Sequence, residues 1–289
     1  MTSKRLILAC AIAVSFTAGH AAARPKKAPA APEIPAVRDV DWVKIDPDNL
    51  LVIDTSRGRL LAELYPSMAP KTVERIKTLA KRHFYDGLTF FRVIDQFMAQ
   101  TGDPTNTGAG GSDLPDIPGE FTFARDIKFP LRVLTTDHGE MAGLSGPMPV
   151  GTQSDALLTL TAAGKVDGWG MFCPGVLGMA RAEKPDSANS QFFIIRQTSS
   201  SIDRRYAAFG RVLVGLDLVR LIKVGEPVPA PQDSMSRVRL ASDLPEGEKV
   251  SLSRLDVNSP TFLAATAVIK DRKGPDFNVC DVDVAIKLD

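Results

Sequence analysis

Short apolar segments set the limits on how this chain can fold. Five of them, each five to seven residues long, are too short for ordinary helices and are rich in the β-branched and aromatic residues typical of strands. They are residues 88–94, 97–101, 175–180, 191–196 and 208–214. Residues 49–65 hold two further segments of this kind around a Ser-Arg-Gly turn, which predicts a β-hairpin.

Two other segments have the apolar spacing of an amphipathic helix. In residues 69–87 the apolar side chains of Val73, Ile76 and Leu79 share one helical face. Residues 215–227 repeat the pattern and end in Gly and Pro, which stop helices. Many short strands with two helices predict a mainly β fold, a closed or nearly closed β-barrel capped by the helices.

The N-terminus has the order of a secretory signal. Lys4 and Arg5 precede an apolar stretch, residues 6–18, and small residues continue to Ala23. The apolar part is shorter than the roughly 20 residues that span a bilayer, so we expect cleavage after Ala23 and no stable membrane insertion. A retained anchor is the alternative. Residues 24–47, rich in Pro and Ala at their start, are predicted to be an extended linker.

Charge and cysteine content exclude several classes of function. Without residues 1–23 the chain has 33 Lys and Arg against 34 Asp and Glu, so nothing electrostatic favours nucleic acid as a partner. Cys173 and Cys280 are too few for a multi-cysteine zinc site, and neither His83 nor His138 has a ligand at metal-binding spacing. We expect no metal. In an oxidising compartment the two cysteines are candidates for a disulfide, stated here as a hypothesis.

One basic residue stands out among the apolar segments. Arg92 lies in "FFRVIDQFMAQ", residues 90–100, with apolar neighbours on both sides. Arg is seldom buried without a partner, and its guanidinium group cannot be deprotonated in a protein. The simple interpretation is a snorkelling side chain with its head in water. The alternative is a functional donor in an apolar groove.

Two stretches, the first of which contains Arg92, carry a more specific pattern. Residues 84–111, "FYDGLTFFRVIDQFMAQTGDPTNTGAGG", and residues 174–196, which include "GVLGMA" and "SQFFI", resemble the cyclophilin family of peptidyl-prolyl cis-trans isomerases. The likeness spans residues 48–226, interrupted by 126–170. It implies a closed eight-stranded β-barrel capped by two helices, a substrate groove on its outer face and no cofactor.

The resemblance also assigns residues to that groove. It implies catalytic roles for Arg92 and Gln100, and a proline pocket with its surroundings for substrate binding. The substrate-binding set is Phe97, Met98, Ala180, Arg181, Gln191, Phe193, Ile202 and Tyr206. Ser201 stands where many members have Trp and Tyr206 where they have His, so sensitivity to cyclosporin stays open.

Taken singly, these residues have simpler interpretations. Phe97 and Met98 fit an ordinary core, Gln100 and Gln191 could satisfy buried strand ends, and Tyr206 could serve packing alone.

The chemistry of X-Pro bonds explains why an isomerase needs such an Arg. Rotation about a peptide bond has a barrier of about 18–20 kcal/mol because conjugation is lost. In the twisted transition state the prolyl nitrogen gains a lone pair that accepts a hydrogen bond. A guanidinium donor aimed at this atom binds the transition state better than either ground state. No nucleophile, acid–base pair or metal is required.

Two regions lie outside the resemblance. Residues 126–170 form an inserted loop region, which either walls the substrate groove or is a passive insertion. Residues 227–289 form a C-terminal extension, predicted to be β-rich. Alternating apolar residues from Val282 to Leu288 predict one buried face there.

The sequence as a whole predicts an exported, periplasmic peptidyl-prolyl isomerase. Its expected partners are proline-containing segments of unfolded envelope proteins. The alternative is a cyclophilin-like binding module or holdase chaperone without turnover. A serine protease is disfavoured because no Ser lies in a G-x-S-x-G setting with a suitable His.

Overall fold

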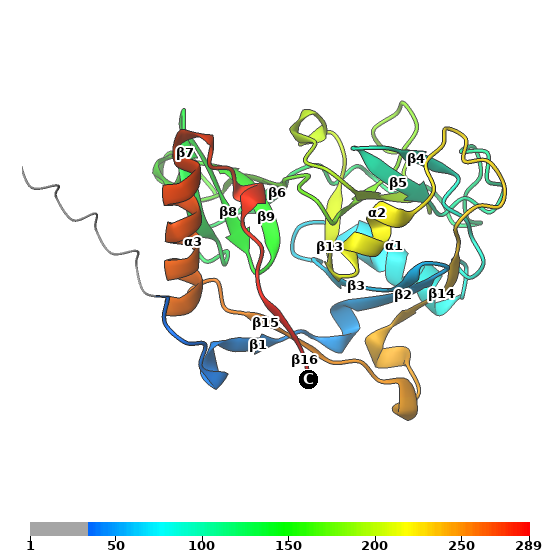
Figure 1. Cartoon of the computed structure of the whole chain (residues 1–289). Coiled ribbons are helices and arrows are strands. Elements are labelled where there is room, and N and C mark those ends of the chain that lie inside the picture. Colours follow the sequence, from blue (N-terminus) through cyan, green and yellow to red (C-terminus); the bar gives the residue numbers. More distant parts are fainter. Residues whose placement is uncertain (1–33) are drawn as a thin grey trace, which may run out of the picture. The chain divides into compact units, whose positions relative to one another are not determined.

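The computed structural model describes residues 34–289, which contain three β-sheets and three α-helices (Figure 1). The expected signal peptide and residues 24–33 of the expected linker lie outside the described residues.

The largest sheet has eight antiparallel strands. In spatial order they are β14 (Met235–Leu240), β2 (Leu50–Thr55), β3 (Gly58–Leu64), β13 (Ala208–Val214), β11 (Val176–Met179), β12 (Phe192–Ile195), β5 (Met98–Thr101) and β4 (Arg92–Ile94). The β2–β3 hairpin and the strands expected in the five short segments are therefore present, although residues 88–91 stay outside β4. The expected domain boundary at residue 226 leaves out β14, which pairs with β2 over most of its length.

This sheet curls into a half-barrel rather than the closed barrel that the sequence predicts. Its edge strands, β4 and β14, share no continuous ladder in the described part of the chain. Isolated bridges next to them, Thr89 with Ser234 and Val93 with Gly225, lie on that side.

Two helices form within the two segments that the sequence predicts to be helical. They are α1 (Pro70–Lys81) and α2 (Leu216–Leu221). The apolar face of α1 is fully buried in the core, together with residues from β2, β3 and β12. Pro70 occupies the first helical position, where its missing N–H costs nothing.

A third helix, α3 (Pro260–Lys273), was not predicted, because the tail was expected to contain only strands. Its start carries clear signals: the Ser259 side chain accepts the Phe262 N–H, and Pro260 follows at the first position. The helix lacks an apolar stripe, since two of its three buried residues are Thr261 and Thr266. Hydrophobic periodicity therefore could not reveal it.

The insertion is a folded sheet rather than a loop region, which corrects the expectation. The sheet has five antiparallel strands, of which β6 lies just before residue 126 and the other four lie within the insertion. In spatial order they are β6 (Phe123–Arg125), β10 (Val166–Gly170), β9 (Met148–Gln153), β8 (Glu140–Ser145) and β7 (Arg132–Asp137). Leu144, Met148 and Val150 of this sheet share one apolar cluster with Phe193 of β12. Figure 1 shows α3 standing beside the inserted sheet.

The tail closes a third sheet with the start of the described chain. Its strands are β1 (Trp42–Lys44), β15 (Leu252–Leu255) and β16 (Ile286–Leu288). Strand β1 lies within the segment expected to be an extended linker. The predicted buried face near the C-terminus is correct for Val282 and Val284 and wrong for Leu288, whose side chain is 65% exposed at the sheet edge.

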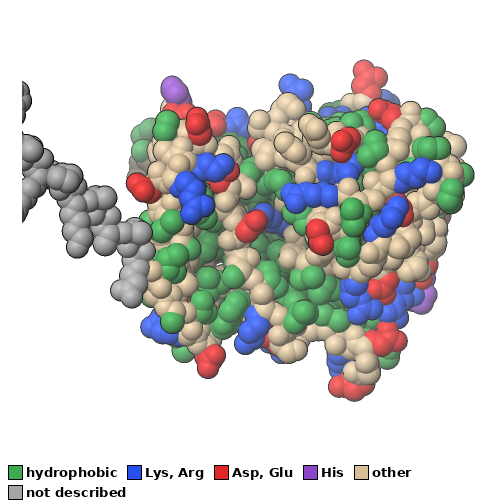
Figure 2. Space-filling view, in the orientation of Figure 1, with side chains coloured by type: hydrophobic (Ala, Val, Ile, Leu, Met, Phe, Trp, Pro, Cys, Tyr) green, Lys and Arg blue, Asp and Glu red, His purple; other side chains and the backbone are tan. Residues whose placement is uncertain are grey.

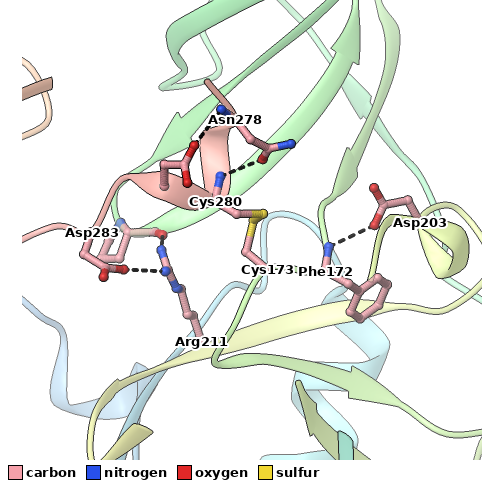
Figure 3. The surroundings of a disulfide bond; sticks show 9 residues. Phe172, Cys173, Asp203, Arg211, Asn278, Cys280 and Asp283 are labelled. Atoms are coloured by element: carbon pink, nitrogen blue, oxygen red, sulfur yellow. Dashed lines mark hydrogen bonds and ion pairs between the residues drawn. A yellow bond between two sulfur atoms is a disulfide. The ribbon is translucent and has the colours of Figure 1, made fainter. Parts of the chain in front are cut away.

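A disulfide joins the tail to the large sheet and confirms the cysteine hypothesis. Cys173, just before β11, is bonded to Cys280, with 5.2 Å between their Cα atoms (Figure 3). Beside it the buried Arg211 of β13 donates to the Pro147 carbonyl of the insertion and, at 2.9 Å, to the Asp283 carboxylate of the tail. The large sheet, the insertion and the tail are therefore connected to one another beside the disulfide.

On the face drawn in Figure 2, acidic and basic side chains are interspersed rather than gathered by sign. None of the helices within residues 34–289 is long and apolar enough to cross a membrane.

Candidate active site

The sheet register brings the two expected catalytic residues face to face. Arg92 of β4 lies opposite Gln100 of β5, and Gln100 lies opposite Phe193 of β12. Directly paired residues on adjacent strands point to the same side of a sheet. Gln191 precedes β12 by one residue and lies beside Gln100.

A relay of side-chain amides ends on Arg92. The Gln191 Nε2 group donates to the carbonyls of Gly108 (3.0 Å) and Gly110 (2.7 Å), so the Gln191 Oε1 atom is left to accept. It accepts from Gln100 Nε2 at 2.9 Å, and Gln100 Oε1 in turn accepts from Arg92 Nη1 at 3.2 Å. The two glycine carbonyls therefore fix the orientation of both amides, and Arg92 is held as a donor.

The carbonyls of Gly108 and Gly110 belong to the loop of residues 108–111, called the glycine loop below. This loop is held by Asp103, for which the sequence analysis assigned no role. Its fully buried carboxylate accepts the N–H groups of Thr105, Thr107, Gly108 and Gly110. Burial alone would raise the pKa of Asp103, but these hydrogen bonds outweigh it and hold the pKa below its usual value. A side chain at position 110 would collide with this carboxylate, which requires Gly there.

The residues of the expected proline pocket form an apolar cluster beside this relay. Phe97, Met98 and Phe193 belong to one apolar cluster, with Ile202 and Tyr206 packed against it. The Tyr206 ring meets the Phe193 ring edge-on, with 5.6 Å between the centroids. Phe97, Ile202 and Tyr206 stay partly exposed, so the cluster offers an apolar surface at the groove.

Arg181 fixes the Tyr206 side of this pocket. Its guanidinium carbon lies 4.9 Å from the centroid of the Tyr206 ring and 5.2 Å from that of Phe121. It also donates to the backbone carbonyls of Ala182, Glu183 and Arg205. The Arg181 side chain is thus bound in place and limits how far Tyr206 can move.

Two hollows flank the pair formed by Arg92 and Gln100. One, of about 440 Å³, is lined by Gln100, Ala180, Arg181, Gln191 and the glycine loop. The other, of about 490 Å³, is lined by Arg92, Gln100, Glu226 and neighbouring residues. Five of the ten residues that the sequence assigned to the groove line these two hollows, and the other five, Phe97, Met98, Phe193, Ile202 and Tyr206, share one apolar cluster. Residues 34–289 contain no cluster of three or more His, Cys, Asp or Glu side chains that could hold a metal.

Asp203, which follows Ile202, is a titratable group at the edge of the pocket. Its carboxylate accepts the Phe172 N–H at 2.9 Å (Figure 3), and the Phe172 ring packs against the Phe193 ring at 5.8 Å. Burial raises the pKa of Asp203 to about 6, against the opposing effects of the Phe172 N–H and the Arg204 charge.

We predict that Asp203 makes the protein less stable as the pH rises. The folded protein binds this proton more tightly than the unfolded chain, so the contribution is complete below about pH 4 and is lost as the pH passes about 6. Asn keeps the acceptor for the Phe172 N–H without the charge. The free energy of unfolding of Asp203→Asn should therefore be about 1–3 kcal/mol higher than that of wild type at pH 8 and nearly equal to it at pH 4.

Urea titrations at both pH values measure this effect. Asp271→Asn, a change at an exposed position of α3, is the control and should follow wild type at both. Equal free energies for Asp203→Asn and wild type at pH 8 would contradict the prediction.

Comparison with known proteins agrees with the geometry. Residues 50–241 match the model of the family described as cyclophilin type peptidyl-prolyl cis-trans isomerase/CLD. The chain is 32% identical over 191 residues, 62% of this chain and 74% of the relative, to a probable peptidyl-prolyl cis-trans isomerase of Brucella suis biovar 1. It is 31% identical over 203 residues, 69% of this chain and 98% of the relative, to peptidyl-prolyl cis-trans isomerase-like 1 of Aspergillus oryzae.

A solved structure extends the likeness beyond the matched family region. The crystal structure of cyclophilin AquaCyp293 from Hirschia baltica superposes with a TM-score of 0.77 at 32% identity, covering 86% of this chain and 93% of that one. This coverage exceeds residues 50–241, so the likeness includes residues outside the matched family region. The chain belongs to the cyclophilin-type peptidyl-prolyl cis-trans isomerase family and is an enzyme of that class.

Proposed function

We propose that this isomerase acts outside the bacterial cytoplasm, in the periplasm, on proline-containing segments of unfolded envelope proteins, with Arg92 as the donor to the prolyl nitrogen. The observation that carries the catalytic part is the amide relay. It ends on a guanidinium beside the apolar cluster that contains Phe97, Met98 and Phe193, which are side chains suited to contact a prolyl ring.

The proposed catalysis combines one hydrogen bond with an apolar groove. A charge-assisted hydrogen bond from Arg92 is worth roughly 1.5–3 kcal/mol. A ten-thousandfold acceleration needs about 5.4 kcal/mol, at 1.36 kcal/mol for each tenfold. The remainder must come from Phe97, Met98 and Phe193, which would exclude water and favour the twisted form of the substrate.

The insertion supports a longer groove. Strand β6 begins two residues after Phe121, whose ring contacts Arg181 at the edge of the proline pocket. The inserted sheet also packs on the apolar cluster that contains Phe193. We therefore propose that the isomerase domain uses its insertion at 126–170 as part of the groove wall, with the residues that follow β14 as a supporting extension.

A turnover measurement tests the enzyme part of the proposal. Residues 24–289, produced without the expected signal peptide, should accelerate cis-to-trans conversion of proline peptides in a protease-coupled assay. A holdase without turnover would bind the same peptides and leave the uncatalysed rate unchanged.

Two features support export. The N-terminal sequence has a basic head, a short apolar stretch and small residues up to Ala23. The Cys173–Cys280 disulfide is of a kind that persists in oxidising compartments.

We predict that the mature protein begins near Arg24. Protein recovered from the periplasmic fraction of a Gram-negative host should have the intact mass of residues 24–289. A Lys4→Glu, Arg5→Glu variant, which removes the basic head, is the control and should stay unprocessed. Recovery of the full chain from the membrane fraction would contradict cleavage.

A further inference from the structure

Glu226 binds the proposed catalytic side chain, although nothing in its sequence context indicates this. Its Oε1 atom accepts from Arg92 Nε at 2.6 Å. The two residues are 134 positions apart in the chain. Gln100 holds the same guanidinium at Nη1.

The backbone around Glu226 is anchored on β4. Gly225 and Val93 exchange two hydrogen bonds, of 2.8 and 2.9 Å, and the Val228 N–H donates to the Phe91 carbonyl at 2.9 Å. These contacts secure the residues on both sides of Glu226 to the strand that carries Arg92. The carboxylate is therefore presented by ordered backbone rather than by a free loop.

The two acceptors leave one nitrogen of the guanidinium for substrate. Nε is bound to Glu226, in the loop after α2, and Nη1 is bound to Gln100, on the neighbouring strand β5. Among the hydrogen bonds of residues 34–289, Arg92 Nη2 has no partner. Because the guanidinium is a rigid planar fork, two fixed nitrogens determine where the third points.

We infer that Glu226 is a positioning residue that, together with Gln100, orients Arg92 so that Nη2 faces the prolyl nitrogen. The inference rests on the proposed donor role of Arg92. An Arg side chain has several rotatable bonds, and fixing it only in the transition state would cost side-chain entropy. Glu226 supplies that order before the substrate arrives, which is how preorganised donors accelerate reactions.

Exposure makes the inference testable without unfolding the protein. The side chains of Arg92 and Glu226 are 37% and 56% exposed, and ion pairs of this kind add little to stability. Positioning needs an acceptor at Nε rather than a negative charge. Gln therefore replaces Glu226 in this role, whereas Ala does not.

The experiment compares Glu226→Ala, Glu226→Gln, Arg92→Ala and the double variant Arg92→Ala, Glu226→Ala in a proline-peptide assay. Glu226→Ala should lower kcat about 3- to 5-fold with KM nearly unchanged, the size expected for losing one exposed ion pair. Glu226→Gln should keep most of the wild-type kcat. In the Arg92→Ala background, Glu226→Ala should cause no further loss, because the two residues act as one unit.

Glu248→Ala is the matched control. Glu248 is 44% exposed and pairs with Arg237 of β14 at 2.6 Å, whereas Arg92 pairs with Glu226 and Gln100. It should retain wild-type kcat.

Several outcomes would overturn the inference. They are wild-type kcat for Glu226→Ala, an effect on KM alone, an equal further loss in the Arg92→Ala background, or a matching loss in Glu248→Ala. If Arg92→Ala itself keeps full turnover, the donor role of Arg92 and the positioning role of Glu226 both fail. A loss in Arg92→Ala with normal Glu226→Ala removes only the latter.

Discussion

Arg92→Ala should lower kcat/KM about 10- to 150-fold while the Kd for proline peptides changes much less. The estimate is the loss of one charge-assisted hydrogen bond of roughly 1.5–3 kcal/mol, made only when the prolyl nitrogen carries a lone pair. In the proposed function, ground-state binding uses mainly the apolar cluster around Phe193, which this variant leaves intact. A protease-coupled assay gives kcat/KM, and peptide titration followed by calorimetry gives Kd.

Two further variants separate this prediction from a general defect. Arg92→Lys should recover little activity, since an ammonium group cannot bind Gln100 and Glu226 through a planar fork while donating to substrate. Phe193→Ala should raise Kd as well as lower kcat/KM, because the proline pocket serves ground and transition states alike.

The snorkelling interpretation of Arg92 predicts another result. It expects some loss of stability with unchanged turnover per folded molecule. Wild-type turnover in Arg92→Ala, with folding verified by circular dichroism, would therefore show that the catalytic assignment is wrong.

Local sequence patterns predicted those parts of the fold that local interactions determine. The β2–β3 hairpin has alternating or continuous apolar residues around a Gly turn, and α1 has a regular apolar face. Each pattern is complete within some 20 residues, so it is readable before any tertiary contact is known.

The inserted sheet could not be predicted because its strands carry residues that strands usually avoid. Pro149 lies in β9, in the middle of the sheet, and Gly143 and Gly151 lie in β8 and β9. A side chain at 143 would collide with the Arg132 carbonyl, and one at 151 with the Trp169 ring. These glycines are explained by tertiary packing, which single-sequence patterns do not contain.

The candidate active site likewise combines residues that the sequence identified with one that it did not. Arg92, Gln100 and Gln191 were assigned through motifs that resemble the family, and the register places them together. Glu226 was missed because only the backbone pairing of Gly225 with Val93 brings it to Arg92. An isolated Glu beside a Pro in a loop has no pattern that would distinguish it from a surface residue.

Removing the Cys173–Cys280 disulfide should cause the largest change in stability. The bond closes a loop of 107 residues. Chain-entropy arguments give nearly 5 kcal/mol for such a loop as an upper value, and typical losses are about 2–4 kcal/mol. In guanidinium titrations, the free energy of unfolding of the double variant Cys173→Ala, Cys280→Ala should therefore be about 2–5 kcal/mol lower than that of the oxidised wild type.

The position of the bond also predicts an effect on the active site. Phe172 precedes Cys173 and packs against Phe193 in the proline pocket, so loosening the tail should raise KM before it alters kcat. Treating the wild type with a reductant should reproduce both effects, whereas the same reductant should leave the double variant unchanged. Two free thiols counted in denaturant under non-reducing conditions would contradict the bond, and equal unfolding free energies would contradict its stabilising role. If the bond did not form, the tail would be held to the apolar cluster by the buried side chains of Val279, Val282 and Val284 and by the Arg211–Asp283 ion pair.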